Sequence, residues 1–156
     1  MPRPDLPRAA VAGILAGLVA GAAMNGFQAI WSDTTGQTSE GEPTTTKAAD
    51  KLAVAATGDK VPEPLRKAAD PAVHYATAAI LGLAYALAAE VWRPVTTGAG
   101  TVFGAATAAV LDEALVPALG LAPPPIATPP ATHAYALASH LVFGIALEGV
   151  RRGLRG

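Results

Sequence analysis

The chain contains no cysteine and few charged residues. Without cysteine it cannot form disulfides, thiolate metal sites or cysteine nucleophiles. Only 15% of its 156 residues are charged, against about 25% in typical soluble domains. The formal net charge is −1, and no basic stripe with interleaved aromatic residues is present, so the sequence gives no reason to expect nucleic-acid binding.

Motifs that carry known chemistry are also missing. The sequence has no nucleotide-binding glycine loop, no H-E-x-x-H spacing and no serine-centred elbow. We therefore predict that the protein is not an enzyme and that it holds no metal and no cofactor.

Long apolar runs dominate what is present, and hydrophobic residues make up 51% of the chain. About 20 apolar residues in a helix cross the hydrocarbon core of a membrane. Four segments of about that length are found, at residues 9–31, 71–91, 95–119 and 131–150. The sequence predicts an all-α fold, a single membrane domain over residues 1–156 built as a four-helix transmembrane bundle.

The first segment has a second interpretation, a cleaved signal peptide. Arg3 and Arg8 precede the apolar run, and Ala20-Gly21-Ala22 is similar to a cleavage site. The run continues beyond that site to Trp31, which favours a retained helix.

Residues 32–70 have the composition of a water-exposed loop. Seven of the twelve acidic residues lie there, balanced by lysines and one arginine. Pro43 predicts the start of a short helix that ends before Gly58, and a second short helix follows Pro62. Pro71 fits the first turn of the second span.

The basic residues predict the orientation. An even number of spans places both termini on one side, and the short loop containing Arg93 lies on that side together with the three arginines of the C-terminus. The proline-rich loop at residues 122–130 carries no charge. The positive-inside rule then places both termini in the cytoplasm and the loop of residues 32–70 outside it.

Small residues recur every fourth position in three of the four spans. Lipid tails are as apolar as leucine, so close backbone approach at small residues must help to hold such helices together. The stripes predict a tight bundle, although a chain this rich in Ala and Gly also produces the spacing by chance. They consist of Gly13, Gly17 and Gly21; Ala78, Gly82 and Ala86; and Gly100, Gly104 and Ala108.

The most informative polar residue within a span is His140, about ten residues inside the fourth. An ionisable group at that depth needs a partner. Asp112 and Glu113 approach the same depth from the third span, so we predict an intramembrane polar cluster of Asp112, Glu113 and His140. The alternative is that the two acids cap a helix that ends near Leu111.

Two further groups of polar residues lie near the ends of the spans. His74 and His133 enter from the outer side and form a possible pair, or are wetted separately by lipid headgroups. Glu90 and Glu148 lie near the cytoplasmic ends, where we expect ion pairs with the neighbouring arginines Arg93, Arg151 and Arg152.

Several motifs in the second half resemble the YagU-like inner-membrane proteins, a bacterial family whose function is unknown. The motifs are VPALGLAPP at 116–124, SHLVFG at 139–144 and EGVRRGLR at 148–155, with further similarity over 74–94. The resemblance implies a multi-pass protein of the bacterial inner membrane with a link to acid tolerance. It assigns no catalytic residue, and the charged loop differs from the family.

Three functions follow from these observations. The first is a multi-pass inner-membrane protein that responds to protons through the cluster at His140, since imidazole titrates near neutral pH. The second is an accessory subunit of a membrane complex. The third is a haem-binding cytochrome with His74 and His133 as ligands. The expected partners are the lipid bilayer and either other membrane subunits or further copies of the chain.

Overall fold

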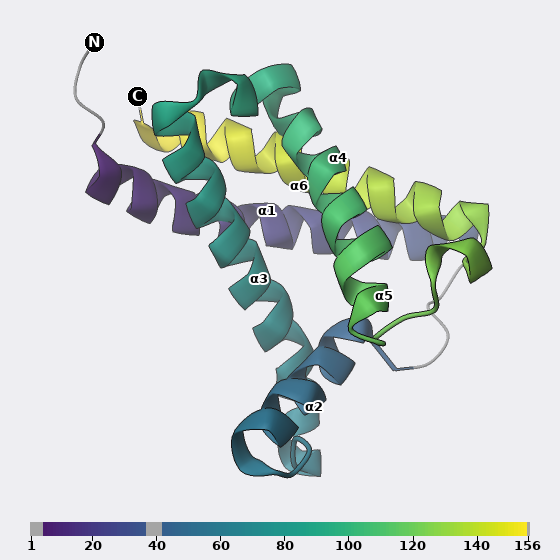
Figure 1. Ribbon diagram of the computed structural model, residues 1–156. Coiled ribbons are helices and arrows are strands. Elements are labelled where there is room, and N and C mark those ends of the chain that lie inside the picture. The colour runs from purple at the N-terminus through teal and green to yellow at the C-terminus, as the bar shows by residue number, and fades with distance from the viewer. Residues whose placement is uncertain (1–4, 37–41, 156) are drawn as a thin grey trace.

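The computed structural model describes residues 5–36 and 42–155, and within these ranges every regular element is a helix. Arg3 and Glu40, which contribute to the expected charge pattern, lie outside the described residues. The elements run in the order α1 (Leu6–Thr35), α2 (Thr44–Thr57), α3 (Glu63–Val91), η1 (Arg93–Gly100), α4 (Thr101–Val110), η2 (Leu111–Leu115), α5 (Val116–Ala118), η3 (Pro125–Ala127) and α6 (Pro130–Arg155) (Figure 1).

Three helical stretches among the described residues are long and apolar enough to cross a membrane. They are Leu6–Thr35, Glu63–Val91 and Arg93–Ala118. α6 has 26 residues, but it carries His133, His140 and Glu148 and does not reach the same hydropathy. Length and composition alone therefore support three of the four expected spans.

α1 and α6 lie side by side in opposite directions, and α3 and α4 cross them at a steep angle (Figure 1). At one end of the antiparallel pair, Arg8 Nη2 donates a hydrogen bond to the carbonyl oxygen of Arg155 at 3.3 Å. At the other end, the ring centroids of Trp31 and Tyr135 are 5.8 Å apart. The two helices are thus matched along almost their whole lengths.

Glycines allow the backbones to touch at both crossings. A Cβ atom on Gly17 of α1 would overlap the carbonyl oxygen of Ala78 on α3. In the same way, a Cβ atom on Gly104 of α4 would overlap the carbonyl oxygen of His140 on α6. The stripes expected from the sequence therefore meet within the chain, and each lets one helix of a pair approach the other closely.

The buried core lies where α1, α3 and α6 meet. It consists of Ala16, Ala20, Ala78, Tyr85, Phe143 and Leu147. Tyr85 of α3 and Phe103 of α4 bring these two helices together near η1, with ring centroids 4.7 Å apart.

The segment before the second span differs from the expectation. The short helix expected after Pro62 and the span expected from Pro71 are one continuous helix, α3, with Pro71 inside it. Proline removes the hydrogen bond to the carbonyl four residues earlier, here that of Lys67. Lys67 is exposed, so water can hydrate the freed carbonyl and the helix continues.

The helix expected between Pro43 and Gly58 is α2, and Arg66 attaches it to α3. Arg66 Nη1 lies 3.2 Å from Asp50 Oδ2, and its other nitrogens face Glu42 and Glu63. The hydrogen bond to Glu42 raises the pKa of Arg66, and the charge of Asp50 acts in the same direction. Asp50 also accepts a hydrogen bond from the backbone N–H of Val61 at 3.1 Å, which closes the α2–α3 hairpin.

The third span, expected over residues 95–119, consists of several helical segments. It begins as η1, whose residues Thr97, Gly98 and Ala99 have non-helical backbone angles. Gly98 and Gly100 have φ values of 64° and 89°, a left-handed conformation that glycine adopts without strain. Beyond α4 the helix widens into the π-helical turn η2.

Candidate functional site

The widened turn η2 places two adjacent carboxylates against α6. Asp112 and Glu113 both lie in this π-helical turn, and both contact histidines of α6. An inserted π turn changes the direction in which the following side chains point, and such turns are frequent at functional sites. The turn therefore lets neighbouring acids reach two different levels of the facing helix.

The contacts pair each acid with one histidine. Glu113 Oε1 lies 2.6 Å from His133 Nδ1, and Asp112 Oδ2 lies 3.3 Å from His140 Nδ1. His133 and His140 are seven residues apart, about two helical turns, so they lie on one face of α6. We call these four residues the His–acid cluster.

Within the His–acid cluster His140 is much less exposed than the two acids. The side chain of His140 is 10% exposed, whereas those of Asp112 and Glu113 are each 35% exposed. His140 Nδ1 also lies 3.0 Å from the carbonyl oxygen of Ala136. His133 Nε2 lies 3.2 Å from the carbonyl oxygen of Pro125, next to the proline-rich loop. The cluster therefore leads from that loop to a buried imidazole.

The structure distributes the expected partners differently from the sequence prediction. Glu113 pairs with His133 and not with His140. His74, the expected partner of His133, has its Nε2 atom 3.3 Å from the carbonyl oxygen of Gly21 and its ring 5.2 Å from that of Tyr75. The two histidines of the possible pair thus have separate partners.

A second polar group surrounds Glu148, which is only 1% exposed. Its carboxylate accepts hydrogen bonds from the Tyr85 hydroxyl at 3.0 Å, from Arg151 Nε at 2.6 Å and from Arg152 Nε at 2.6 Å. We call these residues the Glu148 cluster. It links α3 to the C-terminal turns of α6, and every oxygen of the buried acid has a partner.

Glu90 completes the polar contacts at this end of the helices, but its partner is not one of the three arginines expected from the sequence. Glu90 Oε1 lies 2.5 Å from Arg155 Nη2. Arg155 also donates a hydrogen bond to the carbonyl oxygen of Asp5 at 3.3 Å. This contact joins the ends of α1, α3 and α6.

Sequence reasoning did not identify Tyr85 as part of the Glu148 cluster. A signal was present, because Tyr85 follows Ala78 and Gly82 at helical spacing on the packed face of α3. A tyrosine on a buried face needs a partner for its hydroxyl group, and Glu148 supplies it.

The chemistry available to the His–acid cluster is hydrogen bonding and proton uptake. Among the described residues, no group of three or more His, Asp or Glu side chains is arranged to hold a metal ion. Both ring nitrogens of His133 already have partners. The pairs of imidazole and carboxylate can gain or lose a proton without any other group, and their charge changes when they do.

Long apolar helices that pack through glycine, with ionisable residues held in pairs between them, are typical of integral membrane proteins. Residues 58–149 match DUF1440, a family of proteins of unknown function. The match spans more than half of the chain and includes the whole His–acid cluster, so the chain belongs to this family. No curated protein and no solved structure matches the chain.

Proposed function

We propose that the chain is a multi-pass protein of the bacterial inner membrane that responds to protons through the His–acid cluster. The observation that carries the proposal is the pairing of His133 with Glu113 and of His140 with Asp112. The resemblance to the YagU-like proteins, with its implied link to acid tolerance, favours the same function.

The position of α6 beside α1 supports a fourth span. α1 is apolar enough to cross a membrane, and α6 follows it from the Trp31–Tyr135 contact to the Arg8–Arg155 contact. A helix that accompanies a spanning helix over this length covers the same depth. Its polar residues are tolerated because they face other helices and find partners there.

The arginines support cytoplasmic termini. With four spans, Arg93, Arg151, Arg152 and Arg155 lie on the side of the termini, as the positive-inside rule requires of the cytoplasmic side. The proline-rich loop and His133 then face the outside of the inner membrane. Protons from that side reach His133 first and His140 after it.

The response follows from the charges of the cluster. When both imidazoles are neutral, two adjacent carboxylates repel each other in a partly desolvated place. Protonated imidazoles attract the carboxylates that they contact, which draws η2 and α6 together. No basic residue outside the cluster lies within 4.0 Å of either carboxylate in the described part of the chain, so the histidines determine the charge balance.

A pH series of unfolding measurements tests the proposal. We expect the purified protein to become more resistant to unfolding as the pH falls from about 8 to 5, the range in which imidazole side chains titrate. The gain should be about 1 kcal/mol, because partly exposed ion pairs contribute little. The double variant His133→Gln with His140→Gln should lose this pH dependence.

His74→Gln is the matched control, because it removes a histidine outside the cluster and should keep the pH dependence of the wild type. An unchanged pH dependence in the double variant would contradict the proposal. A loss of pH dependence in the His74 variant alone would place the proton-responsive group elsewhere.

The two other functions are less well supported. A haem ligand needs a free ring nitrogen, whereas both nitrogens of His133 have partners and His74 Nε2 faces the backbone of α1. An accessory subunit would keep small-residue faces for its partners. Here the glycines of α1 and α4 pack against α3 and α6 of the same chain. We propose that the protein is not an enzyme, since the carboxylates of both clusters already contact partners within the chain.

A further inference from the structure

An apolar groove separates α3 from α4. It is lined by Leu81, Phe103, Ala106, Thr107, Val110 and Leu111 and has a volume of about 220 Å³. The only polar lining side chain is Thr107, whose hydroxyl donates to the carbonyl oxygen of Phe103 at 2.8 Å. A cavity must offer several polar partners to hold water, so this groove suits an apolar ligand.

The two helices that form the groove contact each other near η1. Tyr85 and Phe103 hold them together near η1, and α2 lies at the other end of the two helices (Figure 1). α2 reaches the chain beyond α5 through two lysines. Lys47 Nζ donates to the carbonyl oxygen of Leu121 at 3.3 Å, and Lys51 Nζ donates to that of Leu119.

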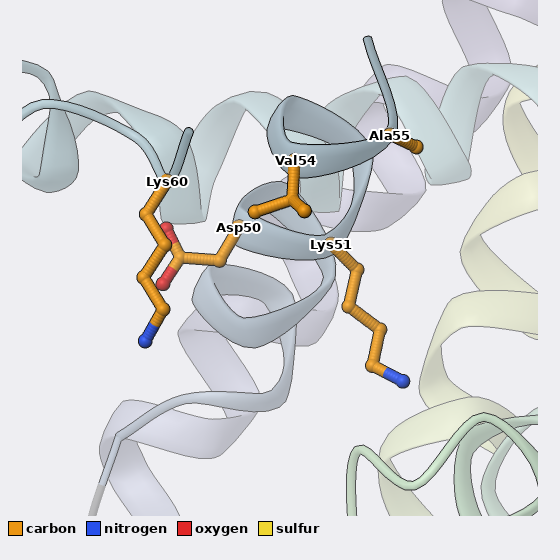
Figure 2. A pocket seen from close by; sticks show the side chains of 5 residues that line it. All are labelled: Asp50, Lys51, Val54, Ala55 and Lys60. Atoms are coloured by element: carbon orange, nitrogen blue, oxygen red, sulfur yellow. The ribbon is translucent and has the colours of Figure 1, made fainter. Parts of the chain in front are cut away.

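The ammonium groups of these two lysines have no direct carboxylate partner. No lysine in the described part of the chain lies within 4.0 Å of a carboxylate. Lys51 and Lys60 flank a hollow of about 310 Å³ whose other lining residues are Asp50, Val54 and Ala55, and Figure 2 shows the two lysine side chains leading away on opposite sides of α2. The carboxylate of Asp50 is occupied by Arg66 and by the backbone of Val61. Lys47 and Lys51, which both donate to the chain beyond α5, form what we call the α2 lysine patch.

The distance between the α2 lysine patch and the α3–α4 groove matches the distance between the headgroup of a phospholipid and the middle of its acyl chain. Leu119, which Lys51 contacts, follows Leu111 of the groove by eight helical residues, or about 12 Å along the axis. That is the separation between the headgroup region and the middle of one leaflet of a bilayer whose hydrocarbon core is about 30 Å thick. The positive charge of the lysines complements the headgroup of an anionic phospholipid, and the apolar groove complements its acyl chain.

We propose that one anionic phospholipid binds to this surface, with its phosphate at the α2 lysine patch and one acyl chain in the α3–α4 groove. The site is independent of the proton response, because it uses none of the residues of the His–acid cluster. It gives α2 a role at the membrane surface.

Native mass spectrometry of the full-length, delipidated protein in a non-ionic detergent tests this site. The probes are phosphatidylglycerol and phosphatidylcholine with identical acyl chains, and glycerol phosphate without chains. We expect one phosphatidylglycerol per chain, bound more tightly than phosphatidylcholine. Each lysine of the patch should contribute about fivefold to this preference.

Two sets of variants separate the headgroup from the acyl chain. Lys47→Gln with Lys51→Gln should abolish the preference for phosphatidylglycerol, whereas Lys67→Gln, outside the patch, should keep it. Ala106→Phe should fill the groove and weaken both lipids, whereas Ala109→Phe on the same helix should not. Circular dichroism checks that each variant is folded.

Three results would overturn the proposal. Equal binding of the two lipids would remove the headgroup site. Competition by glycerol phosphate as strong as that by the lipid would indicate a free phosphate ligand. A dimer that disappears in Ala106→Phe, with no lipid bound to the wild type, would mean that a second copy of the chain occupies the groove.

Discussion

At the scale of the residue, the two polar clusters differ in how their carboxylates are neutralised. Glu148 is buried, and its carboxylate is fully hydrogen-bonded by Tyr85, Arg151 and Arg152. The acids of the His–acid cluster are one-third exposed, and each pairs with an imidazole that is charged only when protonated. The first cluster keeps a constant charge near neutral pH, whereas the second can change its charge.

A prediction at this scale concerns Glu148→Gln. The substitution keeps the shape of the side chain but leaves Arg151, whose side chain is 14% exposed, without its countercharge. Removing one partner of a buried ion pair costs about 3–5 kcal/mol, and we expect the lower end because Arg152 is 60% exposed and can turn to water. Denaturant unfolding of the purified protein measures the loss.

Glu63→Gln is the control for this substitution. Its side chain is 89% exposed and lies 3.6 Å from Arg66, so its removal should change the free energy of unfolding by less than about 1 kcal/mol. Equal losses in the two variants would show that burial of Glu148 is not what makes its ion pairs important.

At the scale of the element, the crossing of α4 and α6 depends on the missing side chain of Gly104. A Cβ atom there would overlap the carbonyl oxygen of His140, on the same turn of α6 that pairs with Asp112. Close packing at this point therefore fixes the distance between η2 and the deeper histidine of the His–acid cluster.

Replacement of two glycines by alanine should have effects of opposite sign. Gly149→Ala, where a Cβ atom meets nothing within 4 Å, should stabilise α6 by about 0.5–1 kcal/mol because alanine favours helix. Gly104→Ala should destabilise the protein by about 1–3 kcal/mol, since the crowded helices must separate. Thermal unfolding of both variants measures the difference, and a stabilising effect of Gly104→Ala would contradict the close crossing.

At the scale of the whole molecule, the proposed four-span topology, with α1 and α6 antiparallel, places both termini on one side of the membrane. Cysteines introduced at Asp59, between α2 and α3, and at Gly153, near the end of α6, should then be labelled from opposite sides by an impermeant thiol reagent. Both positions are exposed, and the chain has no cysteine of its own to interfere. Labelling of both from one side would contradict the four-span topology.

The sequence alone determined the features that depend on local composition. The long apolar runs predicted α1, α3 and the helical stretch from η1 to α5, and Pro43 and Gly58 marked α2, because helix formation and its termini depend on neighbouring residues. The small-residue stripes predicted close helix contacts. α6 is less apolar than the other long helices, so the proposed fourth span rests on its position beside α1 and not on composition.

Only the tertiary structure decided which residues meet. Spacing placed His133 and His140 on one face of α6, but it did not reveal the π-helical turn from which Glu113 contacts one of them and Asp112 the other. The same holds for Tyr85 beside Glu148 and for Arg155 beside Glu90. Sequence periodicity fixes the face on which a side chain lies, whereas its partner depends on how two helices cross, which is determined by contacts between residues far apart in the chain.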